Sequence, residues 1–346
     1  MLNFAPSIQK QMNIPIHKIE NFTDKQLLCV KNVPVLKQGN YFVDDLITVG
    51  GDAPKKFVGV YDYPLPNHKR KANRDNWVRY IAKTGHKWYP VESITELLMN
   101  NLGVIFGLRM ADSRIAMMGG QLRFLSRYFL NPNKEELVHG ADIIAGYLNE
   151  STSFVEEVDR QKLTREWFTL QLVDNAVSSI FPYQKEEIMH ELCRLVIFDA
   201  LIGNNDRHFF NWGVIRSIDG SFQPYFSPVY DTARGLFWNY PESRLTDIID
   251  INKTVDAHIR KYCNQSRPKI GWEGEMNLNH FMLFEKIYRN EFYISEKEIK
   301  EILDTSLIER MLAEVRQNYR SIMTENRIMM ICKCLEYRFN ELRKKL

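Results

Sequence analysis

A long apolar helical pattern that runs directly into a short polar loop is the feature that most restricts the fold of this chain. Residues 185–202 carry apolar side chains along one broad helical face, and Gly203 stands where such a helix would end. The polar run 204–211 follows at once, and two short strands around the Asp219-Gly220 turn then lead to Asp231. We therefore expect a buried helix to hold a polar loop beside the end of a β-hairpin.

Three side chains of this segment suit the transfer of a phosphoryl group from ATP. Such transfer needs a carboxylate that orients the accepting hydroxyl, and oxygen ligands that hold Mg²⁺ against the phosphates. Asp206 and Asn211 lie five residues apart on one loop, and Asp231 closes the hairpin that follows. The pattern predicts Asp206 as the catalytic base, with Asn211 and Asp231 as metal ligands. His208 belongs to the same catalytic loop, where we expect its ring to buttress the loop. The structural alternative is a loop whose side chains only make turn hydrogen bonds.

Residues 1–40 are weakly periodic and are expected to form a short lead-in element, and from Tyr41 to about residue 130 the chain alternates like strands before and after one helical segment. Between the strand patterns, apolar residues recur at helical spacing behind Ser93, which would cap the helix together with Glu96. We expect this helix to end near Gly103. The expected strands are 45–49, 56–61, 77–83, 113–118 and 121–129.

The rest of the chain is helical in character. Helical patterns begin after Pro132, break around Pro182, and are clearest at 185–202, 307–322 and 329–342. The order of elements predicts an α+β fold of two lobes. A small, mostly antiparallel β N-lobe with one key helix would comprise residues 1–130, and a larger helical C-lobe would comprise residues 131–346.

Charge and hydropathy argue against several classes of protein. A net charge of +3 over 346 residues is too small for a dedicated nucleic-acid-binding surface. No run approaches the roughly 18 apolar residues that cross a bilayer, and residues 1–12 lack the apolar core of a secretory signal. Five cysteines, an odd number, are typical of reduced thiols. We therefore expect a cytoplasmic protein, with a secreted, host-directed effector as the alternative. The basic run 68–74 is interpreted as a solvated loop.

The run Asn205-Asp-Arg-His-Phe-Phe-Asn-Trp-Gly-Val, with Ser227-Pro-Val-Tyr-Asp231, resembles the catalytic and metal-binding segments of HipA-like serine/threonine kinases. The short bacterial members are the most similar, and phosphatidylinositol 3- and 4-kinases share the Asp-Arg-His-x-x-Asn loop. The resemblance spans about residues 45–240. It implies a bilobed protein-kinase-like fold that transfers the γ-phosphate of ATP to a protein serine or threonine, with Mg²⁺ as cofactor and autophosphorylation as a further reaction.

The resemblance also assigns residues of the N-terminal half. In such kinases a lysine on the third strand contacts the ATP phosphates and pairs with a glutamate on the following helix. The matching residues are Lys83 and Glu96, with Glu92 as the second choice for the glutamate. Arg127 and Phe129 lie where a hinge would offer backbone groups to adenine.

A loop that covers the phosphates is expected at residues 48–55, which resemble the Ser-x-x-Gly-x-x-x-Lys loop of this family. Gly50, Gly51 and Lys55 would contact the phosphates, because glycines let backbone N–H groups approach phosphate oxygens closely. Thr48 stands at the position of the family's serine, so it is the expected site of autophosphorylation.

Two departures from the family pattern change the expectations. Phe210 stands where many of these kinases carry a lysine before the metal-binding asparagine, and Arg207 is the expected replacement for that charge. The chain also begins about fifty residues before the phosphate loop, so we expect most of the N-terminal subdomain of full-length HipA-like toxins to be absent. A helix-turn-helix antitoxin is a partner that the family implies, although this shortening argues against docking of the usual kind.

A protein that carries serine or threonine is the expected partner, and two other functions stay open. A phosphoinositide kinase would act on phosphoinositide vesicles and not on protein. A kinase-like binding module would hold nucleotide without transferring phosphate, and the trio of Asp206, Asn211 and Asp231 argues against it.

Overall fold

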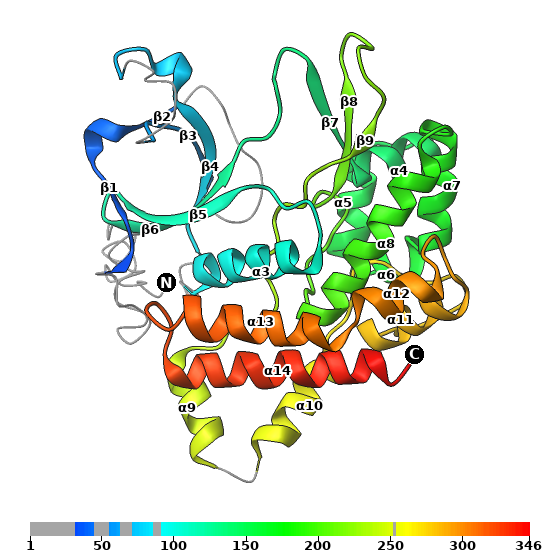
Figure 1. Cartoon of the computed structure of the whole chain (residues 1–346). Helices are drawn as coiled ribbons and strands as arrows, with labels where there is room; N and C mark the ends of the chain where they lie inside the picture. The colour runs from blue at the N-terminus through cyan, green and yellow to red at the C-terminus, as the bar shows by residue number, and fades with distance from the viewer. Residues whose placement is uncertain (1–31, 45–54, 63–70, 86–90, 252–253) are drawn as a thin grey trace, which may run out of the picture.

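The described residues form a curled six-stranded sheet at one side of the computed structural model (Figure 1). The strands lie in the order β1-β5-β6-β4-β3-β2, with β1 parallel to β5 and the other neighbours antiparallel. The structure describes residues 32–44, 55–62, 71–85, 91–251 and 254–346. The strands are β1 (Val35–Leu36), β2 (Tyr41–Val43), β3 (Lys55–Val60), β4 (Val78–Lys83), β5 (Ser113–Met118) and β6 (Gln121–Arg127), with short 3-10 turns η2 (Gln38–Asn40) and η3 (Arg74–Asn76).

Four of the expected strands are confirmed with small shifts at their ends. The strands expected at 56–61, 77–83 and 113–118 correspond to β3, β4 and β5. The strand expected at 121–129 ends earlier, as β6 at Arg127, so Phe129 lies beyond the sheet. Gly119 and Gly120 form the β5–β6 turn with φ of 61° and 81°. The strand expected at 45–49 lies outside the described residues, and β2 is the described antiparallel neighbour of β3.

Helix α3 (Glu92–Phe106) packs against β5 and β6, but both of its expected ends are wrong. Ser93 is the second residue of the helix and does not cap it. The residue before the first turn is Val91, which has no side-chain capping hydrogen bond. Gly103 also lies inside the helix. A Cβ there would come 2.4 Å from Sδ of Met110, so the glycine allows close packing and does not end the helix. The helix ends instead at Gly107, whose φ of 93° is the left-handed conformation that closes helices.

A second, three-stranded sheet contains the expected hairpin and adds one strand after Pro132 that was not expected. Strand β7 (Glu135–His139) pairs antiparallel with β8 (Gly213–Ser217), which pairs with β9 (Tyr225–Phe226). The expected hairpin around Asp219-Gly220 is therefore present as β8 and β9. Strand β7 was missed because its hydrogen-bonding partner comes from a distant part of the sequence, so five residues showed no strand pattern of their own.

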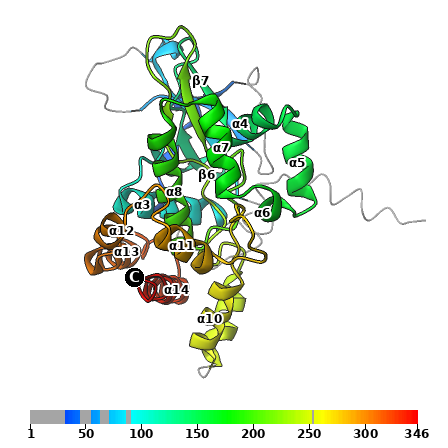
Figure 2. The same ribbon diagram turned by 90° about the vertical axis from the view of Figure 1, so that its right-hand side faces the viewer.

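Helix α8 (Lys185–Ile202) lies in the middle of the helical part, in contact with α3, α7, α11, α14 and β9. Every residue from Leu195 to Ile202 is buried, so the last two turns are enclosed on all sides. Gly203 ends the helix as expected, with φ of 70°. Helix α10 lies at the end of the molecule away from the sheets (Figure 2). The other helices are α4 (Gly140–Leu148), α5 (Thr152–Arg160), α6 (Thr164–Trp167), α7 (Leu170–Ile180), α9 (Glu242–Asp250), α10 (Val255–Gln265), α11 (His280–Arg289), α12 (Glu296–Ile302), α13 (Thr305–Asn318) and α14 (Glu325–Arg343).

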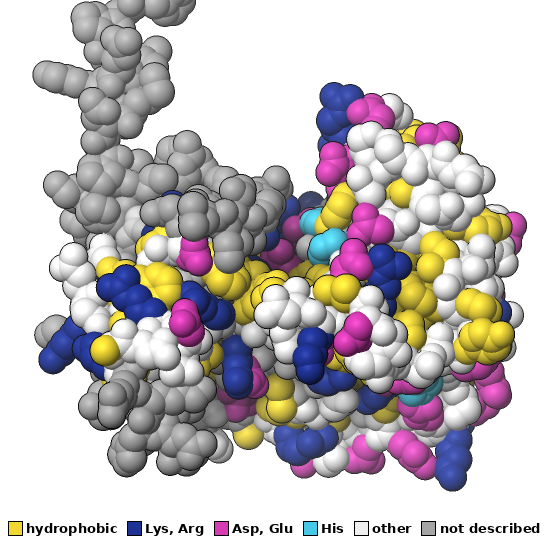
Figure 3. All heavy atoms as spheres, turned by 90° about the horizontal axis from the view of Figure 1, so that it is seen from above, with side chains coloured by type: hydrophobic (Ala, Val, Ile, Leu, Met, Phe, Trp, Pro, Cys, Tyr) yellow, Lys and Arg dark blue, Asp and Glu magenta, His cyan; other side chains and the backbone are white. Residues whose placement is uncertain are grey.

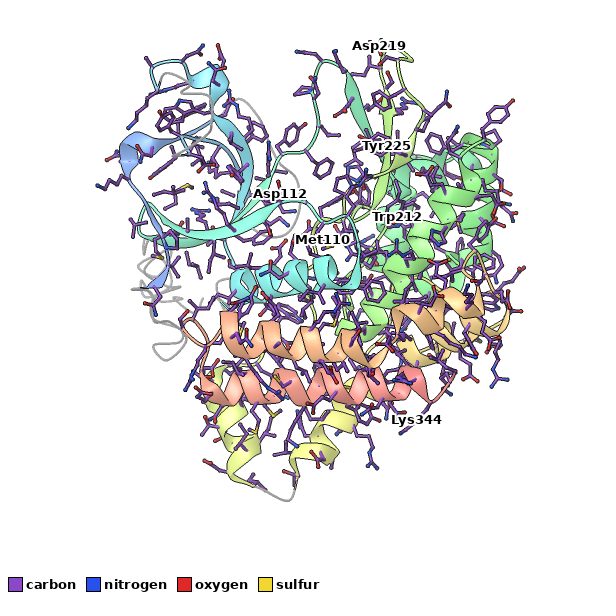
Figure 4. All side chains as sticks on the ribbon, viewed as in Figure 1. Met110, Asp112, Trp212, Asp219, Tyr225 and Lys344 are labelled. Atoms are coloured by element: carbon purple, nitrogen blue, oxygen red, sulfur yellow. The ribbon has the colours of Figure 1, made fainter. Side chains whose placement is uncertain are left out.

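A short backbone pairing joins the N-terminal sheet to the segment that ends at Asp231. Met110, labelled in Figure 4 between α3 and β5, forms an isolated parallel bridge with Val229. The N–H of Val229 donates to the carbonyl of Arg109 at 2.7 Å, and the N–H of Ala111 donates to the carbonyl of Val229 at 3.0 Å. Because these bonds lie two residues before Asp231, they place that residue at the junction of the two parts.

The mixed α+β architecture expected from the order of elements is confirmed. Among the described residues, none of the helices is long and apolar enough to cross a membrane. The lobe boundary at residue 130 stays a prediction.

Candidate active site

Lys83, at the end of β4, makes two buried ion pairs that join the sheet to the helical part. Its Nζ lies 2.5 Å from Oε1 of Glu96 on α3 and 2.9 Å from Oδ1 of Asp231. Lys55 faces Lys83 across the β3–β4 register, and its Nζ lies 2.9 Å from Oδ2 of Asp231. The structure therefore brings together four of the predicted site residues, with two ammonium groups sharing one carboxylate.

Burial makes the charges of this cluster strongly interdependent. Burial alone would lower the pKa of Lys83, but the carboxylates of Asp231 and Glu96 outweigh it and raise that pKa above its usual value. Burial likewise opposes ionisation of Asp231, yet Lys83 and Lys55 hold the pKa of Asp231 well below its usual range. Burial raises the pKa of Glu96 to about 7; Lys83 opposes this shift, and the negative charge of Asp231 adds to it. Lys83 therefore stays charged, which is what phosphate contact requires.

The loop after α8 holds the predicted base in a half-buried position. Burial raises the pKa of Asp206, and the nearby guanidinium of Arg234 partly offsets this. Nη1 of Arg234 lies 3.2 Å from Oδ2 of Asp206. Nδ2 of Asn211 donates to the carbonyl of Asp206 at 2.8 Å, so the amide oxygen Oδ1 is left to accept or to bind a cation.

His208 supports the loop from within, as expected. Its Nδ1 accepts a hydrogen bond from the N–H of Phe210 at 3.3 Å, and its carbonyl accepts from the N–H of Asn211 at 2.8 Å. Burial lowers the pKa of His208, which favours the neutral ring that this acceptor role needs. Seen from above, histidine side chains lie beside acidic ones at the hollow between the two parts (Figure 3).

Arg207 ties the catalytic loop to the segment before Asp231, so its expected role toward phosphate is wrong. Its Nε and Nη2 donate to the two carboxylate oxygens of Asp199 at 2.9 and 3.1 Å. Its Nη1 donates both to the carbonyl of Asn211 at 3.0 Å and to that of Tyr230 at 2.9 Å. Nη2 also donates to Oγ1 of Thr232 at 2.7 Å. All five N–H groups of the guanidinium are therefore used inside the protein.

Because one nitrogen of Arg207 binds the carbonyls of Asn211 and Tyr230, the backbones at the two predicted metal ligands are held close together. Asn211 itself is one ligand, and Tyr230 immediately precedes the other, Asp231. Asp231 adopts a φ of 55°, an uncommon conformation for a residue other than glycine. A carboxylate and an amide oxygen are ligands that Mg²⁺ prefers, so these residues fit that ion.

The Tyr230 side chain makes a second connection between the two loops. Its hydroxyl donates to the carbonyl of Phe210 at 3.1 Å and lies 2.9 Å from Nδ1 of His139, at the end of β7. The ring of Phe129 lies 5.9 Å from that of Tyr230, so the predicted hinge residue does reach the site.

Arg127, the other predicted hinge residue, is turned to a different partner. Its guanidinium pairs with Asp112 at 3.1 Å, and its backbone N–H donates to the Asp112 carbonyl at 2.7 Å. Its backbone N–H is therefore already engaged, which argues against Arg127 as the group that donates to adenine. Thr48, Gly50 and Gly51 lie outside the described residues, so the predicted phosphate loop is represented here by Lys55 alone.

Four residues of the site carried no assignment from the sequence. Asp199 is one polar residue near the end of an apolar helix, and Tyr230 is the residue before Asp231. Arg234 stood beyond Asp231 with no pattern around it, and His139 belonged to the strand that was missed. The hydrogen bonds of Arg207 reveal Asp199 and Tyr230, the ion pair at Asp206 reveals Arg234, and the Tyr230 hydroxyl reveals His139.

The chain is similar to known proteins in sequence and in fold. The model of the HipA-like C-terminal domain family matches residues 47–318. The proinflammatory kinase CtkA of Helicobacter pylori aligns with a TM-score of 0.65 and 14% identity over 88% of this chain and 93% of that chain. HipA from the HipA, HipB and operator DNA complex of Shewanella oneidensis MR-1 aligns with a TM-score of 0.46 and 12% identity over 86% of this chain and 65% of that chain. No curated protein matches the sequence.

The likeness to CtkA shows the fold alone, and it establishes the predicted bilobed, kinase-like α+β architecture. The family match covers most of the sequence and contains Lys83, Glu96, Asp206 and Asp231. The chain therefore belongs to the HipA-like C-terminal domain family, as its catalytic loop predicts.

Proposed function

We propose that this protein is an ATP- and Mg²⁺-dependent kinase that transfers the γ-phosphate of ATP to a serine or threonine hydroxyl of a protein. The observation that carries the proposal is the shared ion-pair cluster of Lys83, Glu96 and Asp231, which Arg207 connects to the loop that bears Asp206. This connection supports the proposal, because the reaction needs cations for phosphate, a base for a hydroxyl and two oxygen ligands at one junction.

Each residue has a separate task in this reaction. Lys83 and Lys55 contact phosphate oxygens, while Glu96 fixes the direction of the Lys83 ammonium. Asp206 orients the accepting hydroxyl and takes its proton, a task that suits a carboxylate whose pKa burial has raised. Asn211 and Asp231 would hold Mg²⁺, which supplies the charge that offsets the phosphates. The Thr48 hydroxyl stays a candidate for autophosphorylation, and a helix-turn-helix partner stays a prediction.

Transfer of radiolabelled γ-phosphate tests the proposal. The purified full chain is incubated with labelled ATP and Mg²⁺, with a dephosphorylated protein mixture in one arm and phosphoinositide vesicles in another. We expect label on protein and not on lipid. Asp206→Asn and Asp231→Asn should each lower the rate by about two to three orders of magnitude.

Asp219→Asn is the matched control, because Asp219 is an exposed aspartate at the tip of the β8–β9 turn (Figure 4). It should keep the rate of the unsubstituted protein. Label on lipid alone would replace the proposal with a phosphoinositide kinase. Nucleotide binding without transfer to either acceptor would instead indicate a binding module.

A further inference from the structure

A short segment that follows α10, residues 266–271, lies directly beside the catalytic loop. Oδ1 of Asn205 accepts hydrogen bonds from Oγ of Ser266 at 2.6 Å and from the N–H of Arg267 at 2.9 Å. Asn205 immediately precedes Asp206, the predicted base. Arg267 is therefore anchored next to the residue that would take the proton of the accepting hydroxyl, where the residues that flank that hydroxyl would pass.

The far end of this segment is packed against α6. A Cβ on Gly271 would come 1.7 Å from the carbonyl oxygen of Arg165, so the two backbones are in direct contact. Nζ of Lys269 lies 2.6 Å from Oδ1 of Asp159, and the same oxygen accepts from Oγ1 of Thr164 at 2.8 Å. These contacts hold the start of α6, which carries Arg165, against the segment.

Arg165 and Arg267 are two half-buried arginines that influence each other's charge. Burial lowers the pKa of Arg267, and the positive charge of Arg165 lowers it further. In the part of the chain that the structure describes, neither guanidinium forms an ion pair with a carboxylate, and Nη1 of Arg267 donates only to the carbonyls of Asn264 and Ser266. Two positive charges that repel one another and have no negative partner favour an anion supplied from outside.

The other cations around the site each have a carboxylate of the protein itself. The pairs are Lys55 and Lys83 with Asp231, Arg207 with Asp199, Arg234 with Asp206, and Lys269 with Asp159. The alternative for Arg165 and Arg267 is that water alone solvates them, as it does many surface arginines. Such arginines contribute little to binding, so the two interpretations give different results.

We propose that Arg165 and Arg267 form an anion-binding site for the acceptor protein, which recognises a carboxylate or phosphate group on a residue close to the serine or threonine that receives phosphate. The inference rests on the proposed function, and it names the class of substrate as an acidic protein segment. Two guanidinium groups suit this task, because each presents planar N–H groups that match the oxygens of a carboxylate or phosphate.

Binding and phosphorylation of peptide pools test this site. Each pool carries one central serine among uncharged residues, and the positions on both sides of the serine hold glutamate, phosphoserine, alanine or lysine. Fluorescence anisotropy measures binding of the labelled pools to the full chain in the presence of ADP and Mg²⁺. The phosphate-transfer assay then gives kcat/KM for each pool.

The variants are Arg165→Gln, Arg267→Gln, and a charge-reversed protein in which both arginines become glutamate. Arg160→Gln is the matched control, because Arg160 is an arginine of the neighbouring helix α5 that already has a carboxylate partner, Glu157. Circular dichroism confirms that each variant is folded before its binding is measured.

We expect the unsubstituted protein to bind the glutamate and phosphoserine pools at least about tenfold more tightly than the lysine pool. Each single glutamine variant should lose about threefold to tenfold of this preference, and Arg160→Gln should keep it. The charge-reversed protein should prefer the lysine pool, a result that loss of folding cannot produce. Tighter binding of phosphoserine than of glutamate would identify phosphate as the preferred anion, and equal binding would identify acidic residues in general.

An unsubstituted protein that does not distinguish the glutamate pool from the lysine pool overturns the inference, and so does an equal loss of preference in Arg160→Gln. Binding to phosphoinositide vesicles that requires both arginines, without a preference among the peptides, would assign the site to a lipid head group instead. If the unsubstituted protein transfers no phosphate, the proposed function fails, and the binding preference still decides the role of the two arginines. If the charge-reversed protein does not fold, the single glutamine variants carry the comparison.

Discussion

Arg207 and Asp199 form a two-bond ion pair in the interior, with Nε to Oδ2 at 2.9 Å and Nη2 to Oδ1 at 3.1 Å. Each side chain is 4% exposed. The pair joins the last turns of α8 to the catalytic loop, and the remaining N–H groups of Arg207 reach the segment before Asp231. A buried guanidinium is tolerated here because every donor has an acceptor.

We expect Arg207→Met to lower the free energy of unfolding by about 3–5 kcal/mol, since it removes the positive charge from a buried carboxylate and a donor from two carbonyls. Urea unfolding measures the change. Arg216→Met is the control, because the Arg216–Glu136 pair has side chains 50% and 51% exposed and should contribute less than about 1 kcal/mol. Equal, small losses in the two variants would contradict a structural role for Arg207.

Gly203→Ala should destabilise the protein more than Gly220→Ala. Both glycines are left-handed, with φ of 70° and 73°, so each alanine carries a strain of about 1–2 kcal/mol. At Gly203 the new Cβ would also lie 2.5 Å from Nη2 of the buried Arg338, whereas at Gly220 it meets nothing within 4 Å. Thermal unfolding should show the added cost of about 1–3 kcal/mol at Gly203. If the two variants melt together, Arg338 has room to move aside.

The stability difference between the unsubstituted protein and Glu96→Gln should fall as the pH rises from about 5 to about 7.5. The pKa of Glu96 is raised from its usual 4.5 to about 7 in the folded state, because of burial first and of the nearby Asp231 charge. Between these values the folded protein keeps a proton that the unfolded chain has released, so raising the pH removes stability.

Glutamine at position 96 does not titrate, so it removes this pH-dependent contribution. Unfolding of both proteins at several pH values gives the difference, and Glu136→Gln on the exposed face serves as the control. A difference that stays flat or grows with pH would mean that Lys83 keeps Glu96 ionised throughout this range.

Lys83→Met should lower the rate of phosphate transfer by about 10² or more, because it removes a preorganised cation from the phosphates and leaves Asp231 and Glu96 facing one another. Lys56→Met is the control: Lys56 is exposed on β3, next to Lys55. Steady-state kinetics of both variants measures the effect. Similar rates for the two variants would remove Lys83 from the mechanism.

Much of the framework could be predicted because its signals are local. Helix α8 with Gly203 after it, the β5–β6 turn and the loop from Asp206 to Asn211 depend on residues that are close in sequence. The Lys83–Glu96 pair was predicted from the resemblance to the kinase family. The resemblance could assign both residues because they lie on a strand and a helix that follow one another in the expected order. The predictions for the ends of α3, at Ser93 and Gly103, were wrong. In a sequence, a glycine that ends a helix cannot be told from a glycine that makes room for a neighbour such as Met110.

The sequence by itself determined the order of elements and which loop carries the acid and the amide, because hydrophobic periodicity and turn residues act over a few positions. Only the tertiary structure decided that Arg207 serves the loops and that Arg234 serves Asp206. Both are arginines near the same acids, and a sequence does not say which carboxylates and carbonyls each guanidinium will reach. That choice depends in part on contacts between distant residues, such as Arg207 with Tyr230 and Arg234 with Asp206, which form only when the chain has folded.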